Sequence, residues 1–142
     1  MSFDLELINN DIKISTNGDV RVVTDTPKLR QDVLKIIITP LGSSTINPWY
    51  GCSVNDDIIG KNLPELLNDS MIRDSIFQSL ENLRTLQKSQ MSDQNVSLAE
   101  VIKSIIDIHA ERDSDDPRKI NIVVSILTAR LSKIDEVFTL TA

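Results

Sequence analysis

The sequence predicts an α+β fold, in which a small antiparallel sheet of two hairpins is covered on one face by about three helices. Segments near both ends of the chain alternate between apolar and polar residues, as the strands of a half-buried sheet do. Between them, apolar residues recur at helical spacing in three stretches. The order hairpin, helix, loop, two helices, hairpin is typical of a sheet with its helices on one face. With 142 residues, the chain is expected to form a single domain over residues 1–142.

The first hairpin is expected over residues 11–22. Asp11–Ser15 and Asp19–Val22 both alternate with period two. Asn17-Gly18 stands between them, and this dipeptide supplies the positive φ angles that a tight hairpin turn needs. We therefore expect the two segments to pair as antiparallel strands.

The first helix is expected to follow directly. Thr26 can serve as its N-cap, and Pro27 fits the first helical position, where its fixed φ suits the helix and its missing N–H is not needed. The helix should stop near Thr39-Pro40, because proline disfavours helical geometry in the residue before it. Its buried face is expected to consist of Leu29, Val33, Ile36 and Ile37.

Two further helices are expected after a long loop. The second lies near Ser70–Gln87, and a polar connection follows it to residue 95. The third is expected over Ser97–Ile108, since Ser97 and Glu100 have the spacing of a capping box ahead of an apolar run. The apolar positions are Ile72, Ile76, Leu80 and Leu83 in the second helix, and Val101, Ile102, Ile105 and Ile106 in the third.

The loop of residues 39–54 is rich in Gly, Pro, Ser and Asn around an aromatic pair, Trp49-Tyr50. This composition predicts an ordered loop. Trp and Tyr are common hot-spot residues of protein interfaces. The pair is therefore interpreted either as a lid on the core or as an interface anchor.

The second hairpin is expected at the end of the chain. Lys119–Thr128 and Asp135–Thr141 both have the pattern of strands, and residues 129–133 separate them. Antiparallel pairing through a short connection is the expected arrangement.

Composition excludes several classes of function. A formal charge of −6 argues against a nucleic-acid-binding face. The N-terminus lacks the pattern of a signal peptide, and no apolar run reaches membrane-spanning length. One cysteine, Cys52, and one histidine, His109, cannot supply a structural zinc site. We expect Cys52 to be a small buried apolar residue, and we expect no metal and no cofactor.

No catalytic constellation is recognised. His109 is expected at the C-terminal end of the third helix, where the helix dipole favours a capping role. The acidic cluster Glu111, Asp113, Asp115 and Asp116 lacks the glycine and the distal glutamate of a calcium loop, so it is interpreted as a solvated turn. Paired carboxylates could serve glycoside hydrolysis. With 21 acidic residues in the chain, however, some pair always lies close together.

Asp116-Pro117-Arg118 stands where the acidic turn meets the strand from Lys119. Proline stiffens this point and pushes Asp116 towards extended geometry. Arg118 can then offer a planar fork of donors to a carboxylate or to backbone carbonyls. The triplet is interpreted as a contact for a partner protein, although such a triplet is more often a turn that opens a strand.

Four short motifs, read in order, resemble the baseplate wedge and sheath-initiator family of contractile-tailed phages and related injection machines. They are Leu29-Arg30-Gln31, Thr39-Pro40-Leu41-Gly42, Pro48-Trp49-Tyr50-Gly51 and Asp116-Pro117-Arg118. The chain departs from the family pattern at two places. Asp116 stands where the family usually has Glu, and Ser43-Ser44 replaces a common Glu-Arg.

The resemblance implies a structural protein without enzymatic activity or cofactor. It implies a place in the tail baseplate of a virion, assembled in the bacterial host cytoplasm, with six copies per baseplate and with wedge, sheath and tube proteins as partners. The triplet Asp116-Pro117-Arg118 would dock on the wedge. A sheet edge can accept a strand from another chain, and the segment expected to do so contains Val137, Phe138, Thr139 and Leu140.

Two other functions remain open. Some relatives are labelled lysozyme-like, so the first alternative is a small peptidoglycan-cleaving tail enzyme. The second is an unrelated adaptor domain whose hairpins bind another protein. The sequence alone does not distinguish them.

Overall fold

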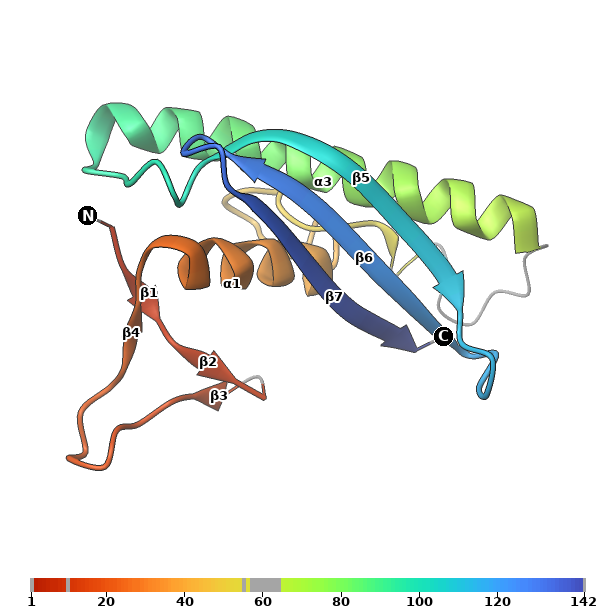
Figure 1. The fold of residues 1–142 in the computed structure, drawn as a ribbon, viewed down its shortest axis with the longest axis horizontal. Helices are drawn as coiled ribbons and strands as arrows, with labels where there is room; N and C mark the ends of the chain where they lie inside the picture. The colour runs from red at the N-terminus through yellow and green to blue at the C-terminus, as the bar shows by residue number, and fades with distance from the viewer. Residues whose placement is uncertain (1, 10, 55, 57–64, 142) are drawn as a thin grey trace.

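Three long antiparallel strands form the main sheet of the protein (Figure 1). The computed structural model describes residues 2–9, 11–54, 56 and 65–141. The strands are β5 (Ile102–Arg112), β6 (Lys119–Thr128) and β7 (Lys133–Thr141), and they lie in the order β5-β6-β7. Within this described part of the chain, both outer strands are therefore sheet edges.

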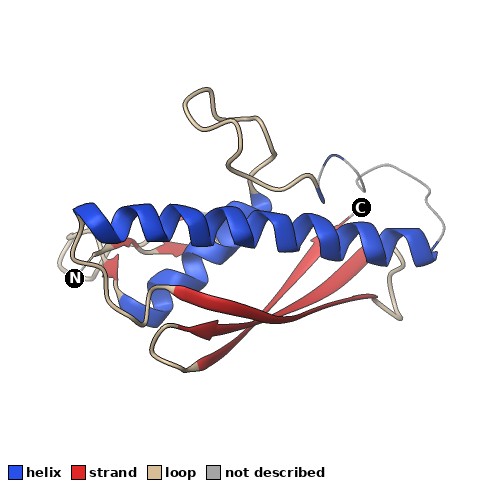
Figure 2. Ribbon diagram, turned by 90° about the horizontal axis from the view of Figure 1, so that it is seen from above, coloured by secondary structure: helices blue, strands red, loops and turns tan. Residues whose placement is uncertain are grey.

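Two helices, α1 (Asp25–Ile38) and α3 (Glu65–Asp93), cover one face of this sheet (Figure 2). Even-numbered residues of β6 point towards the helices and are buried from Ile120 to Thr128. The apolar ones, Ile120, Ile122, Val124 and Ile126, form one hydrophobic cluster with the buried faces of both helices. The other sheet face meets solvent, as the exposed side chains of Val137 and Thr139 show.

A smaller unit precedes α1 and projects away from the main sheet (Figure 1). Strand β1 (Asp4–Leu5) pairs with β4 (Val22–Val23), and β2 (Leu7–Ile8) pairs with β3 (Asp11–Ile12), both antiparallel. We call residues 4–9 and 11–23 the N-terminal lobe.

The prediction of an N-terminal hairpin is confirmed, but its place in the fold is not the one expected. Ile14 pairs antiparallel with Val20, and Gly18 adopts a φ of 86° in the turn between them. The hairpin does not join the C-terminal strands in one sheet, because its arms pair with the segment that precedes them. The α+β class thus holds, while the arrangement of two hairpins under three helices is wrong.

The first two helices are confirmed. All four residues predicted for the buried face of α1 are buried, and so are those predicted for the second helix. Helix α1 begins earlier than expected, with Thr24 as N-cap in place of Thr26, and it ends at Ile38 as expected. Helix α3 contains the predicted Ser70–Gln87 and extends beyond it at both ends.

The third predicted helix, Ser97–Ile108, is wrong, because residues 102–112 form strand β5. Ser97 and Glu100 do make contacts typical of a capping box, since the Ser97 N–H donates to Glu100 Oε2 at 3.3 Å. The chain then enters a strand, whose register against β6 shifts twice before Asp107. These bulges break the alternation of side chains, so the isoleucines recur at a spacing that resembles a helical stripe.

This outcome also changes the placement of His109. His109 does not cap a helix but lies on the solvent face of β5, with its Nε2 atom 3.5 Å from Glu111 Oε2. The C-terminal hairpin is confirmed, with a shorter connection than expected. Strand β6 spans the predicted Lys119–Thr128, and β7 begins two residues before the predicted Asp135.

Candidate docking surfaces

The free edge of β7 is a regular row of backbone groups. Its register against β6 runs without a shift from Lys133 to Thr141. At the turn, the Thr128 N–H donates to the Ser132 carbonyl at 3.0 Å, which makes these two residues a hydrogen-bonded pair. Because such pairs alternate along an antiparallel ladder, the residues whose N–H and C=O groups point away from β6 are Asp135, Val137 and Thr139.

Helix α1 supports this assignment at the first of the three positions. Arg30 Nη1 donates to the main-chain oxygen of Asp135 at 3.2 Å and also to Glu136 Oε2 at 2.8 Å. The Asp135 carbonyl therefore points off the edge, where α1 covers it. By the same alternation, Val137 and Thr139 leave their backbone groups available to another strand.

The four residues predicted for strand addition point in two directions. Val137 is 65% exposed, and Thr139 is exposed beside it on the solvent face. Phe138 and Leu140 are half-buried and pack against the core. A strand from another chain would thus bond the backbone groups of Val137 and Thr139. The side chains of Phe138 and Leu140 anchor β7 to the core.

The opposite edge, β5, is less regular. Two register shifts bend it, and bulges of this kind discourage pairing with another chain. In addition, Asp107 Oδ1 accepts a hydrogen bond from the Ile108 N–H at 2.9 Å. The edge better suited to strand addition is therefore β7.

Asp116-Pro117-Arg118 lies at the exposed turn between β5 and β6. The Arg118 side chain is 75% exposed, with Nε 3.2 Å from Asp116 Oδ1 and Nη2 3.4 Å from Oδ2. This hydrogen bond from Arg118 lowers the pKa of Asp116 and raises that of Arg118 itself. Arg118 therefore donates two hydrogen bonds to a carboxylate, as predicted, but that carboxylate belongs to Asp116 of the same turn.

Asp113 shapes this turn, and the sequence had not singled it out for that role. Its Oδ1 atom accepts the backbone N–H of Asp115 at 2.8 Å and that of Asp116 at 3.4 Å. Its Oδ2 atom accepts from Asn121 Nδ2 at 3.3 Å. The bond from the Asp115 N–H is the main reason why the pKa of Asp113 lies below its ordinary value. An aspartate whose side chain accepts the backbone N–H two residues further on is typical of such a turn.

Trp49 and Tyr50 differ in position: one covers the core, and the other is exposed at the surface. Tyr50 is half-buried and packs against the core, and this burial raises the pKa of its hydroxyl. Trp49 is 40% exposed and lines a surface hollow of about 430 Å³ beside Leu86 of α3. The lid is therefore Tyr50, and Trp49 is the side chain that a partner can reach.

Two of the sequence motifs meet in the loop. The Cys52 N–H donates to the Thr39 carbonyl at 2.8 Å, and Pro40 and Cys52 form a parallel bridge. Gly51 has a φ of 127°, and a Cβ atom there would lie 2.7 Å from the Thr39 oxygen. Only glycine fits this close approach. Cys52 itself is buried, as expected.

Gln31, in the first motif, holds the N-terminal lobe against α1. Its Nε2 atom donates to the Leu5 carbonyl at 2.7 Å, while its Oε1 atom accepts the Leu7 N–H at 2.9 Å. The side-chain amide thus bonds one backbone C=O and one backbone N–H of this segment, as the backbone of a neighbouring strand would. Glu100, buried inside the protein, adds a second tie, since its carboxyl group accepts from Ser2 Oγ and from the Asp25 N–H.

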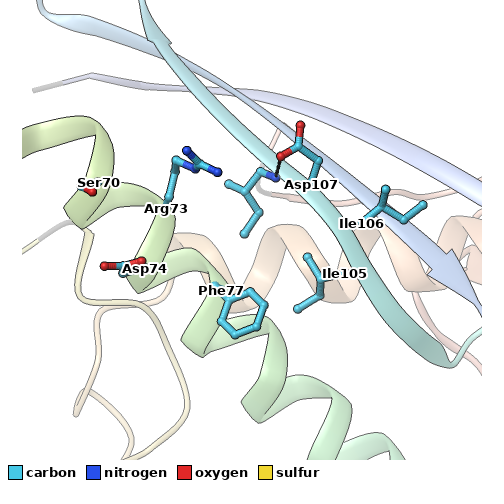
Figure 3. A pocket seen from close by; sticks show the side chains of 8 residues that line it. Ser70, Arg73, Asp74, Phe77, Ile105, Ile106 and Asp107 are labelled. Atoms are coloured by element: carbon cyan, nitrogen blue, oxygen red, sulfur yellow. Dashed lines mark hydrogen bonds between the residues drawn. The ribbon is translucent and has the colours of Figure 1, made fainter. Parts of the chain in front are cut away.

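A hollow of about 380 Å³ lies between α3 and β5. Figure 3 shows Asp74 and Asp107 on opposite sides of it, with their carboxyl groups pointing away from each other, and Arg73 between the helix and the strand. Both carboxyl groups belong to exposed residues. A glycosidase needs one carboxyl group kept protonated by an apolar environment, and this hollow does not enclose either of them.

Within the described residues, no group of three His, Cys, Asp or Glu side chains is placed to hold a metal ion. The search for membrane spans, over the same part of the chain, finds no helix long and apolar enough to cross a bilayer.

Comparison with solved structures shows a likeness in fold. The crystal structure of a candidate tail lysozyme from Geobacter sulfurreducens superimposes with a TM-score of 0.59, and the match covers 80% of this chain and 86% of that one. The two chains share a fold. Their sequences are 12% identical, so the likeness carries the fold and not the activity. No protein-family model matches the sequence, and no curated protein sequence matches it.

Proposed function

We propose that this chain is a structural protein of a contractile tail, which sits in the inner baseplate and templates the first sheath ring by strand addition. One observation carries the proposal: β7 is a sheet edge of unbroken register, whose backbone groups at Val137 and Thr139 point outward. An added strand would pair with them and fix its own register. The shared fold with a protein described as a tail lysozyme supports a tail-associated role.

The remaining partners follow from the same proposal. The turn at Asp116-Pro117-Arg118 docks on wedge proteins, with Arg118 as its exposed cation. Trp49 is an additional anchor on another side of the molecule. Six copies surround the tail tube in each baseplate, which is assembled in the host cytoplasm and becomes part of the virion. No cofactor, nucleic acid or membrane takes part.

Substitution of Thr139 by proline tests the template directly. Proline removes one backbone donor, and at Thr139 that donor points away from β6. We expect Thr139→Pro to fold, as judged by circular dichroism, and to yield baseplates without extended sheaths in electron micrographs. Phe138→Pro is the matched control, because its N–H faces β6 and its loss should unfold the sheet. Normal sheaths on folded Thr139→Pro baseplates would exclude β7 as the template.

A peptidoglycan-cleaving enzyme is the second candidate, favoured by the description of the Geobacter protein. The carboxyl groups to test are Asp74 and Asp107, which border the hollow in Figure 3. Turnover of peptidoglycan that disappears in Asp74→Asn or Asp107→Asn would replace the structural proposal. An unrelated adaptor is the third candidate, and neighbouring genes for sheath and tube proteins would argue against it.

A further inference from the structure

A groove lies beside the point where the open edge of β7 begins. It has a volume of about 450 Å³ and is bounded by α1, the N-terminal lobe and the inward side of β7. In Figure 1 the lobe lies on the β7 side of the sheet, away from β5. Glu136 lines the groove from β7, and Val23, Leu34 and Ile38 supply apolar walls from the lobe and from α1. We call it the edge groove.

The backbone groups of β7 decide what kind of chain can reach this groove. Val137 and Thr139 turn their N–H and C=O groups outward, and an extended chain is what pairs with such a row. Side chains that lie side by side on neighbouring strands project from the same face of a sheet, whether the strands are parallel or antiparallel. The residue of an added strand that lies beside Glu136 would therefore point towards the helices, as Glu136 does, and enter the edge groove.

Helix α1 is placed to cover such an added strand. A helix is about 10 Å across, which is about twice the spacing of neighbouring strands. Arg30 brings α1 to the margin of the sheet, because it bonds the Asp135 carbonyl that points off the edge at 3.2 Å. Leu34 and Ile38 follow Arg30 at steps of four residues, so these side chains share one side of the helix. Ile38 is 41% exposed and Leu34 is half-buried, which leaves apolar surface of α1 for an entering side chain to contact.

The charged groups of the edge groove already have partners. Among the described residues, four charged ones line it, and each forms an ion pair within the protein: Glu6, Arg30, Lys35 and Glu136. The pair of Arg30 with Glu136, at 2.8 Å, lies in the groove itself. A charged side chain that enters would lose water without gaining a partner, whereas an aliphatic one gains by leaving water. The groove therefore favours an aliphatic residue.

We propose that the edge groove is a side-chain pocket for the strand that β7 accepts, and that the residue of this strand beside Glu136 is aliphatic. The inference rests on the strand addition proposed above. In strand addition, main-chain hydrogen bonds give affinity, and pockets for alternate side chains give specificity. Leu34 and Ile38 of α1 are thus specificity-determining residues for a partner whose backbone pairs with β7.

A strand supplied within the same chain tests this inference. The probe is the full chain extended at its C-terminus by an Asn-Gly turn and a strand designed to pair antiparallel with β7. In one version the residue beside Glu136 is valine. In the other it is threonine, which differs from valine by its hydroxyl group. We expect both versions to protect the amides of Val137 and Thr139 from hydrogen exchange, and the valine version to melt about 3 °C or more above the threonine version.

Variants of α1 show whether the groove causes this difference in melting temperature. Ile38→Gln keeps a good helix former but removes the apolar side chain, and it should remove the difference between the valine and threonine versions. Leu34→Gln repeats the test one turn earlier in the helix. Met91→Gln, at an apolar residue of α3 that is 44% exposed, is the control and should leave the difference unchanged. Circular dichroism establishes that each variant is folded.

Three results would overturn the inference. The first is protection of Val137 and Thr139 in both versions with equal melting temperatures, which would mean that β7 accepts a strand while the groove does not select its side chain. The function proposed above would then stand. The second is a difference between valine and threonine that persists in both folded glutamine variants, which would assign it to another contact. The third is a lack of protection in both versions, in which case β7 accepts no strand and the proposed function fails as well.

Discussion

Arg30 of α1 donates a hydrogen bond to the main-chain oxygen of Asp135 and so closes one end of the free edge of β7. The same guanidinium bonds Glu136, which points inward from that strand. The open part of the edge therefore begins at Val137. This contact joins the first helix to the last strand, and it defines how much of β7 another chain can reach.

Arg30→Met should lengthen the open edge with little change in stability. The Arg30 side chain is 46% exposed, and exposed ion pairs contribute about 1 kcal/mol or less. We expect a change in the free energy of unfolding below about 1 kcal/mol in urea titrations. A loss of several kcal/mol would mean that Arg30 is a main support of β7. Arg21→Met, which removes an exposed ion pair with Glu6 in the N-terminal lobe, is the control and should cost a similarly small amount.

Gly51→Ala should destabilise the protein by about 3 kcal/mol or more, because it combines a disfavoured φ with a clash. The new Cβ atom would meet the main-chain oxygens of Thr39 and Pro40 at 2.7 and 2.8 Å. Gly42→Ala is the control, since its φ is 81° but no atom lies within 4 Å of the added carbon. It should cost only about 1–2 kcal/mol. Equal losses in thermal melts would show that the contact between the two loop motifs is not tight.

The turn before β6 should loosen in acid. Hydrogen bonds lower the pKa of Asp113 below its ordinary 3.8 in the folded state. A group with a lowered folded pKa stabilises the fold above its unfolded pKa and loses this contribution as the pH falls through the folded one. The free energy of unfolding, measured from pH 5 down to about pH 2, should therefore fall below about pH 4. Asp113→Asn should abolish this fall. If the free energy of unfolding of Asp113→Asn falls by the same amount, the acid sensitivity belongs to other carboxyl groups. Asp115→Asn is the control and should behave as the parent protein does.

Arg118→Ala should fold almost normally and fail to dock. Arg118 contacts Asp116 at the surface, so its loss leaves the core intact, whereas a charged pair that becomes buried at an interface contributes strongly to affinity. We expect binding to purified wedge protein to weaken about 30-fold or more. Arg118→Lys should restore little, because an ammonium group lacks the planar fork. A variant that unfolds as readily as it fails to bind would make Arg118 a structural residue.

How far the sequence predicts this fold depends on how regular each element is. Strands β6 and β7 keep a strict alternation, so their bounds could be predicted closely. Helix α1 was found with its whole buried face, because Leu29, Val33, Ile36 and Ile37 follow one helical stripe. Strand β5 was missed because Val101, Ile102, Ile105 and Ile106 recur at helical spacing. Its two bulges interrupt the alternation of side chains that would have indicated a strand.

The candidate sites depend on long-range pairing, which one sequence does not reveal. The sequence indicated a strand from Asp135 onward, but only the strand order shows that β6 is the one partner of β7 among the described residues. It indicated that Arg118 could fork onto a carboxylate, but not that Asp116 would supply it. The pairing of residues 4–8 with the first hairpin was hidden for the same reason, since these residues had no predicted partner.

Hydrogen exchange at β7 tests the central claim most directly. In the free protein, the amides of Val137 and Thr139 should exchange rapidly because they point away from β6, while those of Phe138 and Leu140 should be protected by the ladder. Addition of purified sheath protein should protect Val137 and Thr139 and leave their two neighbours as they were. If the complex forms while Val137 and Thr139 continue to exchange rapidly, strand addition at β7 is contradicted.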